Sequence, residues 1–94
     1  AWYEPPLYCD VTANANDVSG GWEWISVVSD YSYRGASVFV GQWSRTGFTS
    51  SISSNRKNIS CTLKGTWAQV VGADGTVLGK YSTSYNFNVS TTDI

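Results

Sequence analysis

The stretch that most constrains this chain runs from Gly65 to Val89, where two apolar runs flank Asp74-Gly75. An Asp-Gly pair between two strand-like runs is the strongest short-range signal for a β-hairpin. A type I′ turn requires positive φ at both central residues, which Asp tolerates and Gly adopts at no steric cost. The sequence therefore predicts one hairpin arm over residues 67–71, a tight turn at Asp74-Gly75 and a second arm from residue 76.

The second arm alternates between two kinds of side chain. One face carries the apolar and aromatic positions, and Ser and Asn occupy the positions between them; the first set is Tyr81, Thr83, Tyr85, Phe87 and Val89. Period-2 alternation with one apolar face is typical of a half-buried strand. The rest of the chain must therefore provide a layer that covers this face.

Short strand-like runs recur along the rest of the chain, separated by segments rich in Gly, Asn and Ser. We expect strands over residues 9–12, 22–29, 36–43, 48–53 and 59–64, with loops or turns over 13–21, 30–35, 44–47 and 54–58. Strong helix formers are scarce, whereas β-branched and aromatic residues are plentiful. The sequence therefore predicts an all-β fold, a small antiparallel β-sandwich of six to eight short strands, as a single domain over residues 1–94.

The N-terminal segment, residues 1–8, contains Pro5-Pro6, which blocks a helix and confines any strand to a sheet edge. We expect it to form an extended arm that Cys9 anchors to the body. Cys9 and Cys61 are the two cysteines of the chain, and in a small Ser-, Thr- and Asn-rich domain a disulfide between them is favoured over two buried free thiols.

A disulfide implies an exported protein. The chain begins with Ala1 and not with Met, as a mature product does after removal of a signal peptide, although a truncated chain begins in the same way. We therefore expect a secreted protein whose signal peptide has already been removed.

Charge is sparse and balanced, with a net charge of -1. Non-specific nucleic-acid binding depends on neutralising many phosphates, and membrane-disrupting helices are cationic, so neither is expected here. No apolar run is long enough for a membrane-spanning helix, and we expect no transmembrane segment.

The residues offer little for catalysis. The chain contains no His, which excludes a Ser-His nucleophile pair and an imidazole-bearing metal site. Most carboxylates occupy predicted turns or termini; Glu23 lies in a predicted strand, where a solvent-facing role is the simpler interpretation. We expect no enzymatic activity, no metal and no cofactor, and keep a small hydrolase with two facing carboxylates as the weaker alternative.

Aromatic residues exceed what a core of this size requires, since the chain has five Trp and six Tyr. Tyr31, Tyr33 and Arg34 share one predicted turn, and Trp43 and Arg45 lie around the end of the next predicted strand. Aromatic rings beside guanidinium groups can stack on sugar rings and pair with phosphate. These five residues form the candidate ligand-binding site. The alternatives are that the large aromatics, Trp43 among them, fill the core and that the turn is merely solvated.

The order of several motifs resembles a known family. The motifs are Gly20-Gly21-Trp22, the stretch from Val27 to Ser32, Gly65-Thr66-Trp67-Ala68, and the stretch KYSTSYNF from Lys80 to Phe87. This order resembles the lactococcin 972 family of secreted bacteriocins over about residues 21–87, and most closely over residues 65–87. The resemblance implies a small β-sandwich, export by a signal peptide and killing without pores, through binding of the cell-wall precursor lipid II and a block of septum formation. This chain differs from the type member in its N-terminal extension through Gly20, its two cysteines and its lack of His.

The residues and the resemblance together predict a secreted bacteriocin-like protein that binds lipid II or another cell-envelope glycan. In this hypothesis Arg34 and Arg45 bind phosphate, while Tyr31, Tyr33 and Trp43 pack on sugar or lipid. The alternative is a secreted non-catalytic module that binds polysaccharide or protein, such as an adhesin or an inhibitor. An exposed aromatic strip on one sheet face favours polysaccharide, and a basic pocket beside backbone N–H groups favours pyrophosphate.

Overall fold

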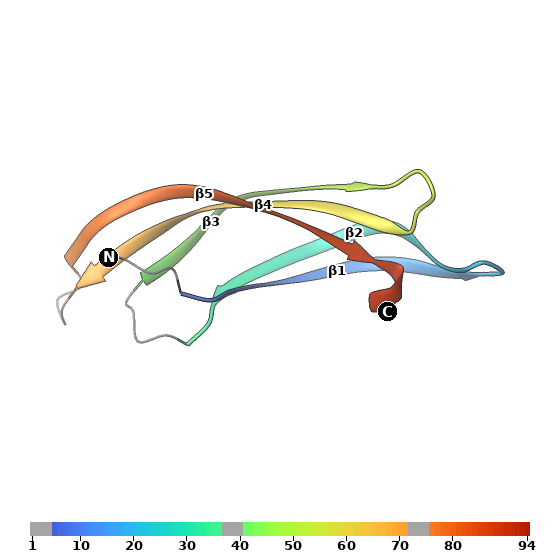
Figure 1. The fold of residues 1–94 in the computed structure, drawn as a ribbon, viewed down its shortest axis with the longest axis horizontal. Coiled ribbons are helices and arrows are strands. Elements are labelled where there is room, and N and C mark those ends of the chain that lie inside the picture. The colour runs from blue at the N-terminus through green and yellow to red at the C-terminus, as the bar shows by residue number, and fades with distance from the viewer. Residues whose placement is uncertain (1–4, 37–40, 72–75) are drawn as a thin grey trace.

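The computed structural model describes residues 5–36, 41–71 and 76–94. These ranges form five antiparallel strands and a terminal 3₁₀ turn: β1 (Leu7–Val18), β2 (Gly21–Arg34), β3 (Gly41–Ile52), β4 (Asn58–Val71), β5 (Thr76–Ser90) and η1 (Thr91–Asp93). β1 and β2 form one sheet, and β3, β4 and β5 form a second sheet in that order. The sheets lie one over the other in an elongated molecule of 56 × 21 × 20 Å (Figure 1). The prediction of an all-β fold is therefore confirmed.

The predicted number of strands is wrong, because segments predicted as loops or turns continue the strands. Residues 13–18 belong to β1, where Ala13 and Ala15 face the core and the alternate residues Asn14 and Asn16 face solvent. Residues 30–34 belong to β2, and residues 44–47 lie inside β3. Polar side chains do not break these strands, because every second side chain faces solvent. Among the inward-facing polar side chains, those of Asp30, Ser32 and Arg34 on β2 form hydrogen bonds with β3 of the other sheet.

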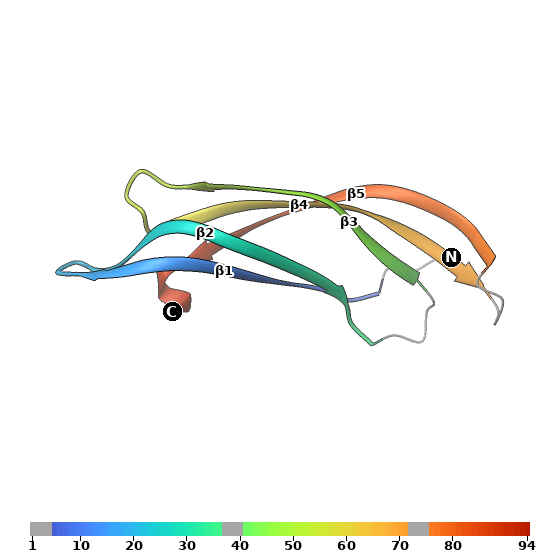
Figure 2. The ribbon, with the colours of Figure 1, turned by 180° about the vertical axis from the view of Figure 1, so that it is seen from behind.

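The strands are bent by irregular pairing. β1 and β2 pair from Leu7↔Arg34 to Val18↔Gly21 with two register shifts, and β3 and β4 shift register between Arg45 and Gly47. A bulge adds one unpaired residue and increases the local twist of a strand. The three-stranded sheet accordingly curves along its length over the two-stranded sheet, as both views show (Figures 1 and 2).

The predicted hairpin is present as the pair β4–β5, which runs from Asn58↔Ser90 to Val71↔Thr76. Its Asp74-Gly75 turn lies outside the described residues, and so do residues 37–40 of the predicted strand 36–43. Phe87 and Val89 pack against the core, as their alternation predicts.

The core follows the inward positions of β4. Trp67, Ile59 and Leu63 are fully buried, and Cys61 lies between the last two at 2% exposure. Trp24 of β2 is buried from the opposite sheet. Partly buried side chains of both sheets complete this layer: Ala13, Ala15, Val27, Phe48, Ile52, Phe87 and Val89. β4 is the central strand of the larger sheet, which explains why its alternate residues are the most deeply buried.

A basic clasp joins the two sheets at the β3–β4 turn. Arg56 donates from Nε to the Trp24 carbonyl (2.9 Å) and from Nη2 to the Ile25 carbonyl (3.1 Å). Lys57 donates from Nζ to the Trp22 carbonyl (2.7 Å). In addition, the Trp24 backbone N–H donates to the Arg56 carbonyl (2.8 Å). The adjacent basic residues Arg56 and Lys57 therefore bind the backbone of β2.

The predicted disulfide is absent: Cys9 and Cys61 are both free thiols. Cys61 Sγ lies 3.9 Å from the Ile59 carbonyl oxygen. Burial raises the pKa of both thiols, so each is protonated at neutral pH and acts as a small apolar side chain. The prediction failed because it used cysteine number and composition alone, whereas each thiol fills one inward position of a strand.

The predicted N-terminal arm is shorter than residues 1–8. Residues 1–4 lie outside the described residues, and Leu7 and Tyr8 already pair with Arg34 and Tyr33. The Pro6 carbonyl accepts a hydrogen bond from the Gly35 backbone N–H at 2.7 Å. This segment is therefore held by backbone pairing and not by a bond through Cys9.

Candidate functional site

Three tyrosines form an exposed row on the outer face of the two-stranded sheet. Tyr31, Tyr33 and Tyr8 are 65%, 39% and 51% exposed. The ring centroids of Tyr8 and Tyr33 are 5.5 Å apart, and those of Tyr31 and Tyr33 are 5.4 Å apart. We call Tyr8, Tyr33 and Tyr31 the tyrosine row.

Strand geometry explains why these rings meet. Residues two apart on a strand share one face, which places Tyr31 beside Tyr33. Tyr8 lies directly across the ladder from Tyr33, and Asp10 lies across from Tyr31. Sequence analysis missed Tyr8, because it assigned that residue to an arm and not to a paired strand. The usable signal was the alternation that starts at Leu7.

Gly35 provides the space in which Tyr8 lies. A Cβ atom at Gly35 would sit 2.6 Å from Tyr8 Cε2 and 3.1 Å from Pro6 Cβ. Both distances are shorter than ordinary contacts, so a larger residue would displace the Tyr8 ring. Gly35 is therefore a second position that sequence analysis missed.

Polar groups continue the same face beyond the tyrosine row. Thr12 pairs with Ser29, and Asn14 pairs with Ser26; all four residues are exposed. Asn14 Nδ2 donates to Ser26 Oγ at 3.2 Å. Exposed aromatic rings beside hydroxyl and amide groups suit a ligand that has both apolar faces and hydroxyl groups.

The other three candidate residues bond across the gap between the two sheets, Arg34 from β2 and Trp43 and Arg45 from β3. Arg34 Nη1 donates to the Gly41 carbonyl (3.0 Å), and Trp43 Nε1 donates to Ser32 Oγ (2.9 Å). The Trp43 ring also packs on Trp67, with centroids 5.2 Å apart. Trp43 thus belongs to the edge of the core, in agreement with the alternative that the large aromatic residues fill the core.

Arg45 forms a two-bond ion pair with Asp30. Its Nε donates to Oδ2 at 2.6 Å and its Nη2 donates to Oδ1 at 2.9 Å. The hydrogen bond to Asp30 raises the pKa of the Arg45 guanidinium. Because the planar fork of the guanidinium already meets a carboxylate, Arg45 would have to give up that partner to bind a phosphate in the same way.

A shallow groove of about 460 Å³ runs between β2 and β3. It brings together three of the five candidate residues, Tyr33, Arg34 and Trp43. Tyr31 and Arg45 are not part of its lining. The remaining lining is polar or small: Ser32, Gly41, Gln42 and Ser44. Tyr33 therefore belongs to both the groove and the tyrosine row.

Two further features would bear on function in the described residues, namely clusters of metal ligands and membrane-spanning helices. No cluster of three or more His, Cys, Asp or Glu residues there could hold a metal ion. No described helix has the length and apolar character to cross a membrane. What the geometry offers is a rigid aromatic surface with an adjoining polar groove.

Comparison with protein-family models, with curated proteins and with solved structures found no match to this chain. The resemblance to the lactococcin 972 family therefore stays a prediction from the sequence motifs.

Proposed function

We propose that this chain is a non-catalytic binding protein for a cell-envelope glycan, and that the tyrosine row is the surface that contacts the sugars. One observation carries the proposal: three tyrosine rings lie side by side and exposed on one sheet face. Sugar rings have apolar faces that pack on aromatic rings, and the phenol hydroxyls can bond to sugar hydroxyls.

The setting of the row supports this role. Tyr has few rotatable bonds, so little conformational entropy is lost when it binds a ligand. The rings are carried by paired strands, which hold a contact surface more precisely than a loop does. The hydroxyl and amide groups of Thr12, Asn14 and Ser26 lie farther along the same face and offer further bonds to a longer glycan chain.

In a more specific form of the proposal, the glycan is lipid II and binding blocks septum formation, as in a bacteriocin. This form requires that the protein is secreted. The motif resemblance supports this form, and so does the groove beside Tyr33, where a phosphate can approach Arg34 while the sugars contact the row. Arg45 is left out of the phosphate site, because Asp30 already occupies its guanidinium.

Titration with a soluble peptidoglycan glycan fragment tests the general proposal, with tyrosine and tryptophan fluorescence as the signal. We expect Tyr31→Ala and Tyr33→Ala each to weaken binding about five- to thirtyfold, as loss of one stacked ring does at about 1–2 kcal/mol. Tyr81→Ala is the matched control, because Tyr81 has the same 39% exposure as Tyr33 but lies on β5. Equal affinity for the wild type and both row variants would refute the glycan surface.

Titration with lipid II then distinguishes the general glycan-binding proposal from the bacteriocin-like form. If lipid II is the target, its affinity exceeds that of the phosphate-free fragment, Arg34→Gln removes the difference, and the protein inhibits growth of Gram-positive indicator strains. Equal affinities with no growth inhibition would leave a polysaccharide-binding module and exclude the bacteriocin form.

A further inference from the structure

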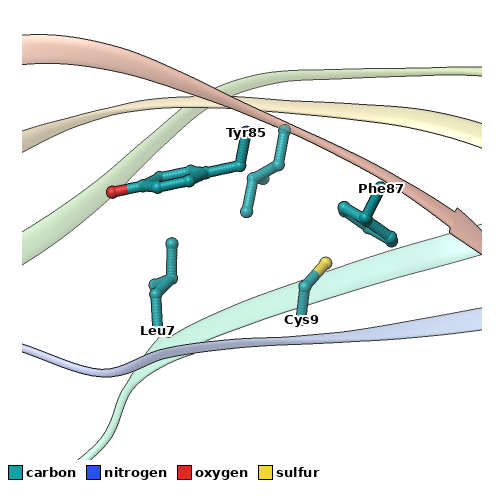
Figure 3. Close-up of a pocket in the computed structure, with 5 residues that line it drawn as sticks. Leu7, Cys9, Tyr85 and Phe87 are labelled. Atoms are coloured by element: carbon teal, nitrogen blue, oxygen red, sulfur yellow. The ribbon is translucent and has the colours of Figure 1, made fainter.

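Two cavities that are open to solvent lie between the sheets, on the side opposite the β2–β3 contacts. There β1 and β5 are the outer strands of their sheets. A cavity of about 380 Å³ is lined by Leu7, Cys9, Leu63, Tyr85 and Phe87. Figure 3 shows Leu7 and Cys9 of β1 pointing toward Tyr85 and Phe87 of β5. Its walls are therefore mostly hydrocarbon and aromatic ring.

A second cavity of about 420 Å³ adjoins the first. The two share Cys9 and Phe87, and the second adds Asp10, Val11, Trp24, Val89 and Asp93. We call the two cavities together the inter-sheet pocket. Each has a volume within the range of small-molecule binding sites, which is about 300–1,000 Å³.

Trp24 lines the second cavity and has an unused hydrogen-bond donor just beneath the cavity wall. Its side chain is 7% exposed, and its Nε1 has no hydrogen-bond partner among the described residues. The buried indole of Trp67, by comparison, donates from Nε1 to the Tyr85 hydroxyl at 2.8 Å. Buried indole N–H groups normally have an acceptor. Nε1 itself is covered by neighbouring atoms, so a ligand oxygen in the pocket would provide the missing bond through a small shift of the Trp24 ring.

Charge at the pocket disfavours an anion. The carboxylates of Asp30 and Asp10 raise the pKa of Cys9 beyond the larger effect of burial, although Arg45 opposes them. Asp93 adds a further carboxylate to the lining. A carboxylate or phosphate group placed beside Cys9 would therefore be repelled.

We propose that the inter-sheet pocket binds a small uncharged amphiphile. Its aliphatic chain packs on Leu7, Leu63 and Phe87, and its oxygen atom accepts a hydrogen bond from Trp24 Nε1. This activity goes beyond glycan binding and uses no residue of the tyrosine row.

Octan-1-ol is the probe, with binding followed by two-dimensional NMR and by tryptophan fluorescence. We expect saturable binding that shifts the resonances of β1 and β5. Each buried methylene contributes about fourfold in affinity, so hexan-1-ol should bind about fifteenfold more weakly. Octanoate, which has the same chain and a negative head group, should also bind more weakly than octan-1-ol.

Trp24→Phe keeps a buried aromatic ring and removes the N–H donor. We expect octan-1-ol affinity to fall about three- to tenfold, which is the usual effect of one hydrogen bond. Trp22→Phe is the matched control, because Trp22 is 42% exposed on the same strand, and it should leave the affinity unchanged. Tyr31→Ala should also leave it unchanged, which separates this pocket from the glycan surface.

Cys9 gives an independent measurement, because it lines both cavities. Octan-1-ol should slow alkylation of Cys9 by iodoacetamide, followed by intact mass, and Cys9→Leu should fill the pocket and reduce binding. If Trp24→Phe does not fold, Cys9→Leu decides the matter. No saturable binding up to the solubility limit, equal affinity for octanoate, or undiminished binding by a folded Trp24→Phe or Cys9→Leu variant would overturn the proposal.

Discussion

Replacing Arg56 with alanine removes two hydrogen bonds that cross from the β3–β4 turn to the other sheet. Their acceptors are the backbone carbonyls of Trp24 and Ile25, at 2.9 and 3.1 Å. Ile25 is the extra residue where Asn14 pairs with Ser26 and Ala15 pairs with Trp24. Arg56 thus satisfies a carbonyl at a bulge, where the ladder is interrupted.

The magnitude follows from the number of bonds and from solvent exposure. A hydrogen bond from a charged group contributes about 1.5–3 kcal/mol, and exposure of Arg56 lowers this to about 1 kcal/mol per bond. Arg56→Ala should therefore lower the free energy of unfolding by about 2 kcal/mol. In a domain of this size that loss corresponds to a fall in Tm of about 8–16 °C.

The backbone at Arg56 permits a second, opposite comparison. Its φ is +59°, a left-handed conformation that costs a residue with a Cβ atom about 1–2 kcal/mol. Arg56→Gly loses the same two hydrogen bonds but relieves this cost, offset in part by the greater freedom of Gly in the unfolded chain. Arg56→Gly should therefore be about 0.5–1 kcal/mol more stable than Arg56→Ala.

Urea unfolding followed by tryptophan fluorescence measures both differences, provided that the m-value is unchanged. Lys64→Ala is the control, since Lys64 is an exposed cation on the outer face of β4 and its loss should change stability by less than about 0.5 kcal/mol. The stabilising role of the Arg56 hydrogen bonds would be refuted if Arg56→Ala were as stable as Lys64→Ala. The conformational argument would fail if Arg56→Gly were the less stable of the two Arg56 variants.

Three further outcomes follow from other contacts. Gly65→Ala places a Cβ against the Trp43 ring and should lower the free energy of unfolding by about 1–3 kcal/mol in the same urea assay; wild-type stability would contradict this contact. Asp30→Asn removes the ionic partner of Arg45, and because exposed ion pairs are screened by salt, the fall in Tm should be larger at 20 mM than at 1 M salt; a loss that does not depend on salt would contradict an ionic role. Burial raises the pKa of Cys61 above its ordinary value of 9.0, so the unfolded chain releases this proton first and stability should fall as the pH rises above 9.0. Cys61→Ala should therefore show a smaller fall in Tm between pH 8 and 10 than the wild type. An equal fall in both proteins would exclude the Cys61 thiol as a cause of the pH dependence.

Alternation along single strands predicted much of the fold. The hairpin partner β5 has a two-residue period of apolar and polar side chains, and Phe87 and Val89 of the inward set pack on the core, whereas Tyr81 near the start of the strand is 39% exposed. Strand continuity was not predictable from composition, because Asn, Asp and Ser are counted as loop residues although they also fit the open face of a strand. Residues 13–18 illustrate this, since Ala13 and Ala15 carry the inward alternation with side chains too small to register as apolar signals.

The candidate site was predictable only in the part that depends on local sequence. The solvent exposure of Tyr31 and Tyr33 was predicted, although both lie in a strand and not in a turn. The pairing of Tyr8 with Tyr33 and of Arg45 with Asp30 joins residues far apart in the chain. Such pairs depend on the register of β1 and on how the sheets are placed, and a single sequence contains no direct signal for either.

Trp43 and Arg45 have a structural role beside the tyrosine row, because both bond to β2, the strand that carries Tyr31 and Tyr33. A two-stranded sheet is marginally stable by itself, and β1–β2 carries the whole tyrosine row. The bonds from Trp43 to Ser32 and from Arg45 to Asp30 attach β2 to the larger sheet at the positions beside Tyr31 and Tyr33. Along β2, outward-facing residues, which in the proposed function contact the glycan, therefore alternate with inward-facing residues that hold the strand in place. Sequence proximity grouped five residues into one candidate site, but strand geometry divides them between the outer face of β2, which carries Tyr31 and Tyr33, and the space between the sheets, where Trp43 and Arg45 hold β2 in place.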